Sequence, residues 1–149
     1  MEKKLRVLFL CTANASRSQM AEGWARCLKS DVIEPFSAGV DPKCLNPLAV
    51  KAMADAGVDI SRQRAKHVSE VMALELDYVV TLCDNARETC PVFPGLATTV
   101  HVGFDDPYTL TLGMADEKEK LKVYVRVRDE IRDFIDSLPQ AFKWADGQP

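Results

Sequence analysis

The sequence lacks any long apolar run. The first apolar stretch, VLFL at residues 7–10, is followed by polar residues and is shorter than the about 7–15 residues of a signal-peptide core. No stretch approaches the about 20 apolar residues that a membrane-spanning helix needs. We therefore expect a cytoplasmic protein with no membrane partner.

Basic residues are not in excess either. The chain has 19 Lys and Arg against 22 Asp and Glu, a net charge of −3, which argues against nucleic acid as a partner. Internal repeats, low-complexity tracts and linkers are also missing. The 149 residues fit one domain, 1–149, that is long enough to bury a core, and we expect it to be a monomer.

Metal-binding motifs are missing as well. The two histidines, His67 and His101, have no partners at ligand spacing, and the five cysteines form no C-x-x-C pair. We expect no metal and no cofactor. An odd number of cysteines without an export signal indicates reduced thiols rather than a disulfide framework.

Apolar strand-like segments alternate with helical patterns along the chain. The predicted strands are 5–10, 32–39, 77–82 and 97–104, and the predicted helices are 17–29, 47–57, 67–75 and 115–138. Asn46 is predicted to cap the second helix and Ser69 the third. This alternation predicts a single α/β domain with a four-stranded parallel sheet of order 2-1-3-4 and helices on both faces. Ligands of such folds bind beyond the carboxyl ends of the strands, where Cys11 and Cys83 are placed.

The segment CTANASR, residues 11–17, joins the first strand to the first helix. Its small residues let successive backbone N–H groups point inward, which makes a nest for an anion at a helix N-terminus. Arg17 can grip two oxygens of a tetrahedral anion, and the same field is expected to lower the pKa of Cys11. Ser18 can donate a hydrogen bond to the thiolate, and Asn14 tolerates the left-handed backbone of a tight loop.

The segment CTANASRSQMAEGW, residues 11–24, resembles the signature loop of the low-molecular-weight protein tyrosine phosphatases and of the thioredoxin-coupled arsenate reductases. The likeness extends to four further segments: FSAG (36–39), VVTLC (79–83), CP (90–91) and FDDP (104–107). The chain departs from the family pattern at Ala13, where glycine is usual, and at Ala15 and Ser16, where many relatives have Ser-Cys or Ile-Cys.

The resemblance implies a substrate, a reaction and a set of site residues. The oxyanion would bind in the loop formed by Thr12, Ala13, Asn14, Ala15, Ser16, Arg17 and Ser18. In the arsenate reductase mechanism, Cys11 attacks arsenate and Asp106 protonates the departing oxygen. Cys83 then displaces arsenite from Cys11, Cys90 attacks Cys83, and thioredoxin reduces the resulting Cys83–Cys90 disulfide. Phosphate and sulfate, which are also tetrahedral, would compete with arsenate.

Two other functions remain open at this stage. A phosphatase would need only Cys11, Arg17 and Asp106, and a non-catalytic thiol sensor would need no general acid. Cys27 and Cys44 have no such context, so we expect them to be structural or incidental.

Two further expectations concern Lys66 and the segment between the relay cysteines. Some relatives hold a potassium ion near the loop, and Lys66 stands at the position of one of its ligands, so its ammonium is expected to replace the ion. If residues 83–90 form a helix, Cys83 and Cys90 lie about 10 Å apart along it. A disulfide needs Cα atoms within about 7 Å, so this segment would have to unwind to oxidise.

Overall fold

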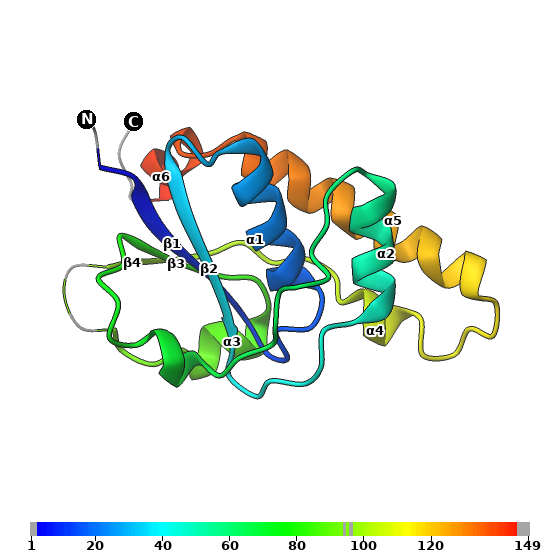
Figure 1. Cartoon of the computed structure of the whole chain (residues 1–149). Helices are drawn as coiled ribbons and strands as arrows, with labels where there is room; N and C mark the ends of the chain where they lie inside the picture. The colour runs from blue at the N-terminus through cyan, green and yellow to red at the C-terminus, as the bar shows by residue number, and fades with distance from the viewer. Residues whose placement is uncertain (1–2, 94, 96, 146–149) are drawn as a thin grey trace.

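The computed structural model describes residues 3–93, 95 and 97–145. They form a four-stranded parallel sheet of order β2-β1-β3-β4, as predicted (Figure 1). The strands are β1 (Leu5–Cys11), β2 (Ile33–Gly39), β3 (Tyr78–Thr81) and β4 (Thr98–His101). The last two are shorter than predicted, although backbone hydrogen bonding extends past their carboxyl ends. Backbone hydrogen bonds from Leu82 to Leu10 (2.9 Å) and from Val102 to Thr81 (2.9 Å) continue the ladder there.

Alternate side chains of β1 enter two separate cores. Val7, Phe9 and Cys11 pack in the core under the long helices, whereas Leu8 and Leu10 pack in a second core on the opposite face of the sheet. All five are buried, since β1 has a neighbour on each side and a layer on each face. An uninterrupted apolar strand is typical of this central position in a parallel sheet.

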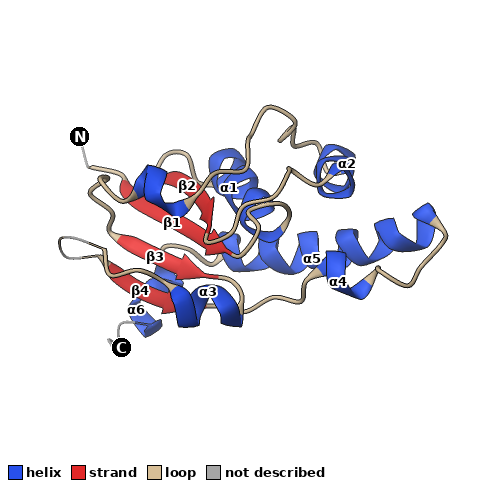
Figure 2. Ribbon diagram, turned by 90° about the horizontal axis from the view of Figure 1, so that it is seen from below, coloured by secondary structure: helices blue, strands red, loops and turns tan. Residues whose placement is uncertain are grey.

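Helices cover both faces of the sheet (Figure 2). The core that contains Phe9 also includes residues of α1 (Arg17–Leu28), α2 (Pro47–Asp55), α5 (Glu117–Asp136) and α6 (Gln140–Ala145). The second core includes residues of the 3-10 turn η1 (Val68–Val71) and of α3 (Asp84–Thr89). The short helix α4 (Pro107–Leu110) lies near α5.

The third predicted helix is wrong in length and in its cap. Only a 3-10 turn of four residues forms, and its Val68 and Val71 are buried. The cap is His67, whose Nδ1 accepts a hydrogen bond from the Ser69 N–H at 3.0 Å, so Ser69 is the donor and not the cap. The patterns also did not predict α4 or α6. They indicated α3 only as one possibility for residues 83–90.

The predicted cap of α2 is confirmed. The Asn46 side chain accepts from the Leu48 N–H at 2.8 Å, Pro47 occupies the first helical position, and the chain leaves the helix at Gly57 with φ 86°.

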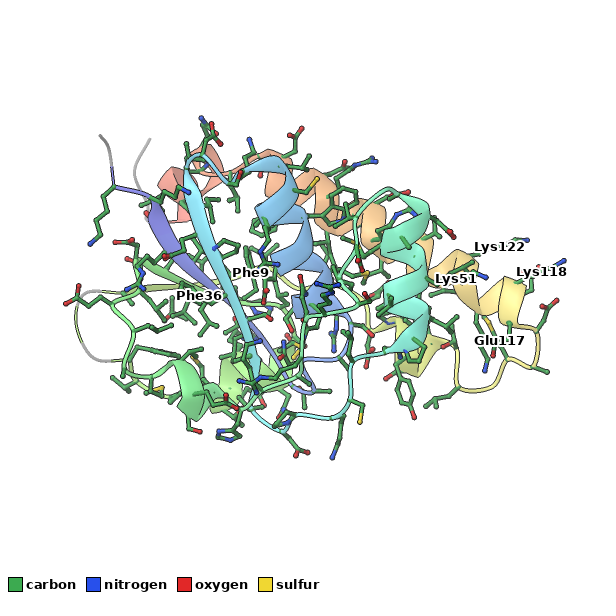
Figure 3. The ribbon with its side chains drawn as sticks, viewed as in Figure 1. Phe9, Phe36, Lys51, Glu117, Lys118 and Lys122 are labelled. Carbon is green, nitrogen blue, oxygen red and sulfur yellow. The ribbon has the colours of Figure 1, made fainter. Side chains whose placement is uncertain are left out.

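Charged side chains extend into solvent where α2 and α5 reach furthest from the sheet. Lys51, Glu117, Lys118 and Lys122 mark this end of the molecule (Figure 3). None of the helices in the described ranges is both long enough and apolar enough to cross a membrane.

Candidate active site

The thiol of Cys11 lies at the base of the loop that joins β1 to α1. Cys11 is 2% exposed, and its Sγ accepts a hydrogen bond from the Asn14 N–H at 3.2 Å. Asn14 has φ 50°, the left-handed conformation expected for this residue, and this conformation directs its N–H toward the sulfur. The predicted loop is therefore folded around Cys11.

The hydroxyl of Ser18 is oriented toward the Cys11 sulfur. The side-chain amide of Asn14 is fixed because its Oδ1 accepts from the Lys66 backbone N–H at 3.0 Å. Its Nδ2 consequently donates to Ser18 Oγ at 2.7 Å. Ser18 has one hydroxyl hydrogen, and the Cys11 Sγ lies 2.9 Å away to receive it. A Cys11 thiolate would accept this hydrogen. Asn14 and Ser18 lie buried behind the loop.

The expected lowering of the Cys11 pKa is not found. Burial raises the pKa of Cys11 above its ordinary value and outweighs three opposing contributions, from the Ser18 hydroxyl, the Arg17 charge and the loop N–H groups. The prediction considered the field of the loop alone and omitted the loss of water around a buried thiol.

Segment 40–46, which follows β2, braces the loop from outside. Backbone N–H groups of Val40, Asp41, Lys43 and Asn46 donate to the carbonyl oxygens of residues 11, 12, 13 and 15 at 2.8–3.1 Å. The two segments approach closely at Gly39, where a Cβ would lie 2.5 Å from the Thr12 carbonyl oxygen. The shape of the loop therefore depends on this second segment.

Arg17 and Asp106 meet across the mouth of the loop. Arg17 donates to the Phe104 carbonyl oxygen at 3.1 Å and lies 3.6 Å from Asp106 Oδ2. Asp106 also caps α4, because its carboxylate accepts from the Tyr108 N–H at 3.0 Å and from the Thr109 hydroxyl at 2.8 Å. Both predicted residues thus face the same space, and the carboxylate is held beside the guanidinium.

A cavity of about 570 Å³ opens above the Cys11 thiol. Seven of the predicted site residues line it: Cys11, Thr12, Ala13, Ala15, Ser16, Arg17 and Asp106. Four residues that the sequence patterns did not assign to the site complete the wall: Lys43, Cys44, Asn46 and Tyr108. Cys44 is an exposed thiol at this rim and not a buried structural residue.

The Cys83 thiol lies against the wall of the same loop. Cys83 directly precedes α3 and makes no side-chain capping hydrogen bond. Its Sγ lies 3.3 Å from the Thr12 hydroxyl, which also accepts from Asn85 Nδ2 at 3.0 Å. Cys90 follows the last residue of α3, and burial raises the pKa of its thiol. All five cysteines are free, so the structure represents the reduced protein. A regular helix rises about 1.5 Å per residue, so a separation of about 10 Å between the Cα atoms of Cys83 and Cys90 is expected.

A buried polar cluster lies behind the loop, at Lys66. Its ammonium is 3.9 Å from Glu22 Oε1 and 3.5 Å from Ser37 Oγ, and Ser37 donates to Glu22. Burial lowers the pKa of Lys66, and the Glu22 carboxylate opposes this effect. The Lys66 ammonium thus lies in contact with two buried polar side chains. Among the described residues, no group of three His, Cys, Asp or Glu side chains is arranged to hold a metal ion.

Curated relatives and solved structures match nearly the whole chain. An arsenate reductase of Bacillus subtilis is 45% identical over 143 residues, which cover 96% of this chain and 100% of the relative. The structure of an arsenate reductase in its phosphate binding state superposes with a TM-score of 0.67 at 27% identity, covering 90% of this chain and 95% of the other. A thioredoxin-dependent arsenate reductase of Corynebacterium glutamicum superposes with a TM-score of 0.65 at 25% identity, covering 94% of this chain and 64% of the other.

The family assignment follows from the sequence match together with the site. The family described as low molecular weight phosphotyrosine protein phosphatase matches residues 6–144, which include every residue that lines the cavity. The loop built around Cys11 and Arg17 occupies the expected edge of the parallel sheet. The chain therefore belongs to the low molecular weight phosphotyrosine protein phosphatase family.

Proposed function

We propose that the protein reduces arsenate to arsenite, with Cys11 as nucleophile and Cys83 and Cys90 as a thiol relay. The observation that carries the proposal is the position of Cys83, whose thiol lies 3.3 Å from the Thr12 hydroxyl in the wall of the anion loop. A phosphatase has no use for a second thiol at this place. The arsenate reductases among its relatives support the same reaction.

The first step joins arsenic to Cys11. The Cys11 thiol attacks HAsO₄²⁻, a bond forms between sulfur and arsenic, and one oxygen leaves as water. The thiol proton, passed on through Asp106, joins the arsenate proton to make this water, so atoms and charge balance. If Cys11 starts as a thiolate, Asp106 must already be protonated, and its carboxyl proton completes the water. Asp106 delivers the proton to the leaving oxygen, and Arg17 neutralises the anion in the dry base of the loop.

The second step transfers two electrons to arsenic. Cys83 attacks the Cys11 sulfur, a disulfide forms, and the electron pair of the sulfur–arsenic bond leaves with arsenite, which takes up the Cys83 proton. The two thiols are oxidised and arsenic(V) becomes arsenic(III). Cys90 then attacks the Cys83 sulfur and releases Cys11 as a thiol, so the oxidised form carries a Cys83–Cys90 disulfide.

The proposed reductant of this disulfide is thioredoxin, since one structural relative is a thioredoxin-dependent arsenate reductase. A dithiol protein reduces such a bond by ordinary thiol exchange. Four further properties remain predictions: the cytoplasmic location, the monomeric state, the competition by phosphate or sulfate and the independence from metals.

A single turnover tests the proposal. Reduced protein is mixed with arsenate without any reductant, quenched with an alkylating agent and digested with trypsin, which cleaves after Arg87 and so separates Cys83 from Cys90. The expected result is about one equivalent of arsenite and a peptide pair joined through Cys83 and Cys90. If every cysteine is alkylated and no arsenite appears, the proposal fails, and hydrolysis of an aryl phosphate by the same protein would assign it to the phosphatases.

A further inference from the structure

The first turn of α3 is attached to the end of the sheet through His101. This residue ends β4 and pairs in register with Thr81 at the end of β3. Its Nδ1 lies 2.9 Å from Thr81 Oγ1, and its Nε2 lies 3.5 Å from Oδ1 of Asp84, the residue that follows Cys83. A chain of contacts therefore connects two strand ends to the neighbour of the Cys83 thiol.

The contact between His101 and Asp84 forms when a ring proton is on Nε2. In a neutral ring of this tautomer, the buried Thr81 hydroxyl donates to Nδ1 and the Nε2 proton faces Asp84. In the charged ring both nitrogens carry protons, and the Thr81 hydroxyl turns to the Val100 carbonyl oxygen at 3.5 Å. The other charged group that faces Asp84 is Arg87, at 3.8 Å.

The opposite end of α3 has fewer polar contacts, although Cys90 and Phe93 pack against the second core. In the described part of the chain, the Cys90 thiol donates only to the carbonyl oxygen of its own neighbour, Pro91, at 3.5 Å. Val92, two residues further, is 93% exposed. By contrast, the Cys83 end has the contacts of Asp84 with His101 and of Asn85 with Thr12.

We propose that His101 is a positioning residue for the thiol relay. Acting through Asp84, it holds the first turn of α3 so that Cys83 stays against the anion loop. When Cys83 and Cys90 form their disulfide, α3 then unwinds from its Cys90 end, and Cys90 covers the difference between about 10 Å and the about 7 Å that a disulfide allows. The inference rests on the proposed function, since it assigns a role within the relay.

The rate at which Cys83 forms a disulfide with Cys11 measures the positioning of Cys83 directly. In a Cys90→Ser background the relay stops at the Cys11–Cys83 disulfide, whose formation after arsenate addition is followed by quenching and peptide mapping. We expect His101→Leu to slow this step about two- to fivefold, the effect of losing one partly exposed contact. His101→Gln, which keeps an N–H donor, should restore the rate, and the affinity for phosphate should not change.

Variants of Asp84 provide a second test of the inference. Asp84→Ala should slow the same step as much as His101→Leu does, and the double variant should be no slower than either, because both remove one contact. Glu88→Ala, which removes another exposed carboxylate of α3, is the matched control and should have the wild-type rate. Equal rates in all variants, or additive losses without rescue by glutamine, would overturn the inference while arsenate reduction stands. If no Cys11–Cys83 disulfide forms even with His101 present, the proposed function fails and the inference fails with it.

Hydrogen exchange locates the end that unwinds. In the reduced protein the Arg87 N–H donates to the Cys83 carbonyl oxygen at 3.1 Å. In the protein oxidised at Cys83 and Cys90, we expect the Arg87 amide to remain protected and the Thr89 amide to lose its protection. Loss of protection at both amides would show that the first turn is not held.

Discussion

Replacing Ser18 by alanine tests whether its hydroxyl stabilises the Cys11 thiolate. Ser18 Oγ lies 2.9 Å from the sulfur and can donate its only hydrogen to a Cys11 thiolate. A hydrogen bond to a charged acceptor contributes about 1.5–3 kcal/mol, and one pKa unit corresponds to about 1.4 kcal/mol. The pKa of Cys11, already raised by burial, should therefore rise by about one to two further units.

The assay is the rate of alkylation of Cys11 by iodoacetamide at a fixed pH of about 8. Below the pKa, the thiolate fraction falls tenfold per unit of pKa increase, but the more basic thiolate reacts faster and recovers nearly half of the logarithmic loss. We therefore expect a rate about three- to tenfold lower in Ser18→Ala. Trypsin releases Cys11 alone in peptide 7–17, so the rate is read for this thiol only.

Two controls define the outcome. Ser30→Ala changes an exposed serine beyond the far end of α1 and should react like the wild type. In concentrated urea all variants should react alike, since the contact exists only in the folded protein. An unchanged or faster rate for folded Ser18→Ala would refute the assigned direction of the hydrogen bond.

Three further predictions concern Gly39 beside the Cys11 loop, the acid Asp106 and the polar cluster at Lys66. Gly39→Ala places a Cβ against the Thr12 carbonyl oxygen, so it should lower the free energy of unfolding by about 1–3 kcal/mol and weaken phosphate binding. Gly113→Ala has open space around it and should leave the free energy of unfolding unchanged in denaturant titrations. Asp106→Asn should slow arsenite release in a single turnover by about a hundredfold or more while phosphate still binds, and Asp105→Asn should change it little. Because Lys66 stands in the polar cluster, activity should be equal in potassium and sodium salts at equal ionic strength, and a clear advantage for potassium would contradict this role.

The sequence was sufficient for features that depend on local pattern. The uninterrupted apolar run of β1 indicated a central strand, and Asn46-Pro47 indicated the start of α2 through its cap. The loop at Cys11 was recognised because small residues, a cysteine and an arginine are placed between a strand and a helix. Such signals lie within a few residues of one another, so no knowledge of distant contacts is needed.

Features that depend on distant segments were missed. Lys43 and Cys44 reach the cavity because segment 40–46 leaves the sheet beside the Cys11 loop, and the only sequence signal was that β2 ends at the same edge. The pKa of Cys11 was predicted in the wrong direction because burial is a property of the assembled layers. The helix α3 is a single polar turn and a half whose buried residue is Ala86, which is too weak a periodicity to identify it.

The central place of β1 has a consequence for newly made protein. β1 is first in the chain, but its two neighbours in the sheet are residues 33–39 and 78–81, so Cys11 is enclosed only after much of the chain has been synthesised. Pairing of strands so distant in sequence is a slow part of folding. During that interval the Cys11 thiol lacks the enclosure that the assembled sheet gives it. We therefore expect Cys11 to be alkylated faster in partly folded chains than in the folded protein.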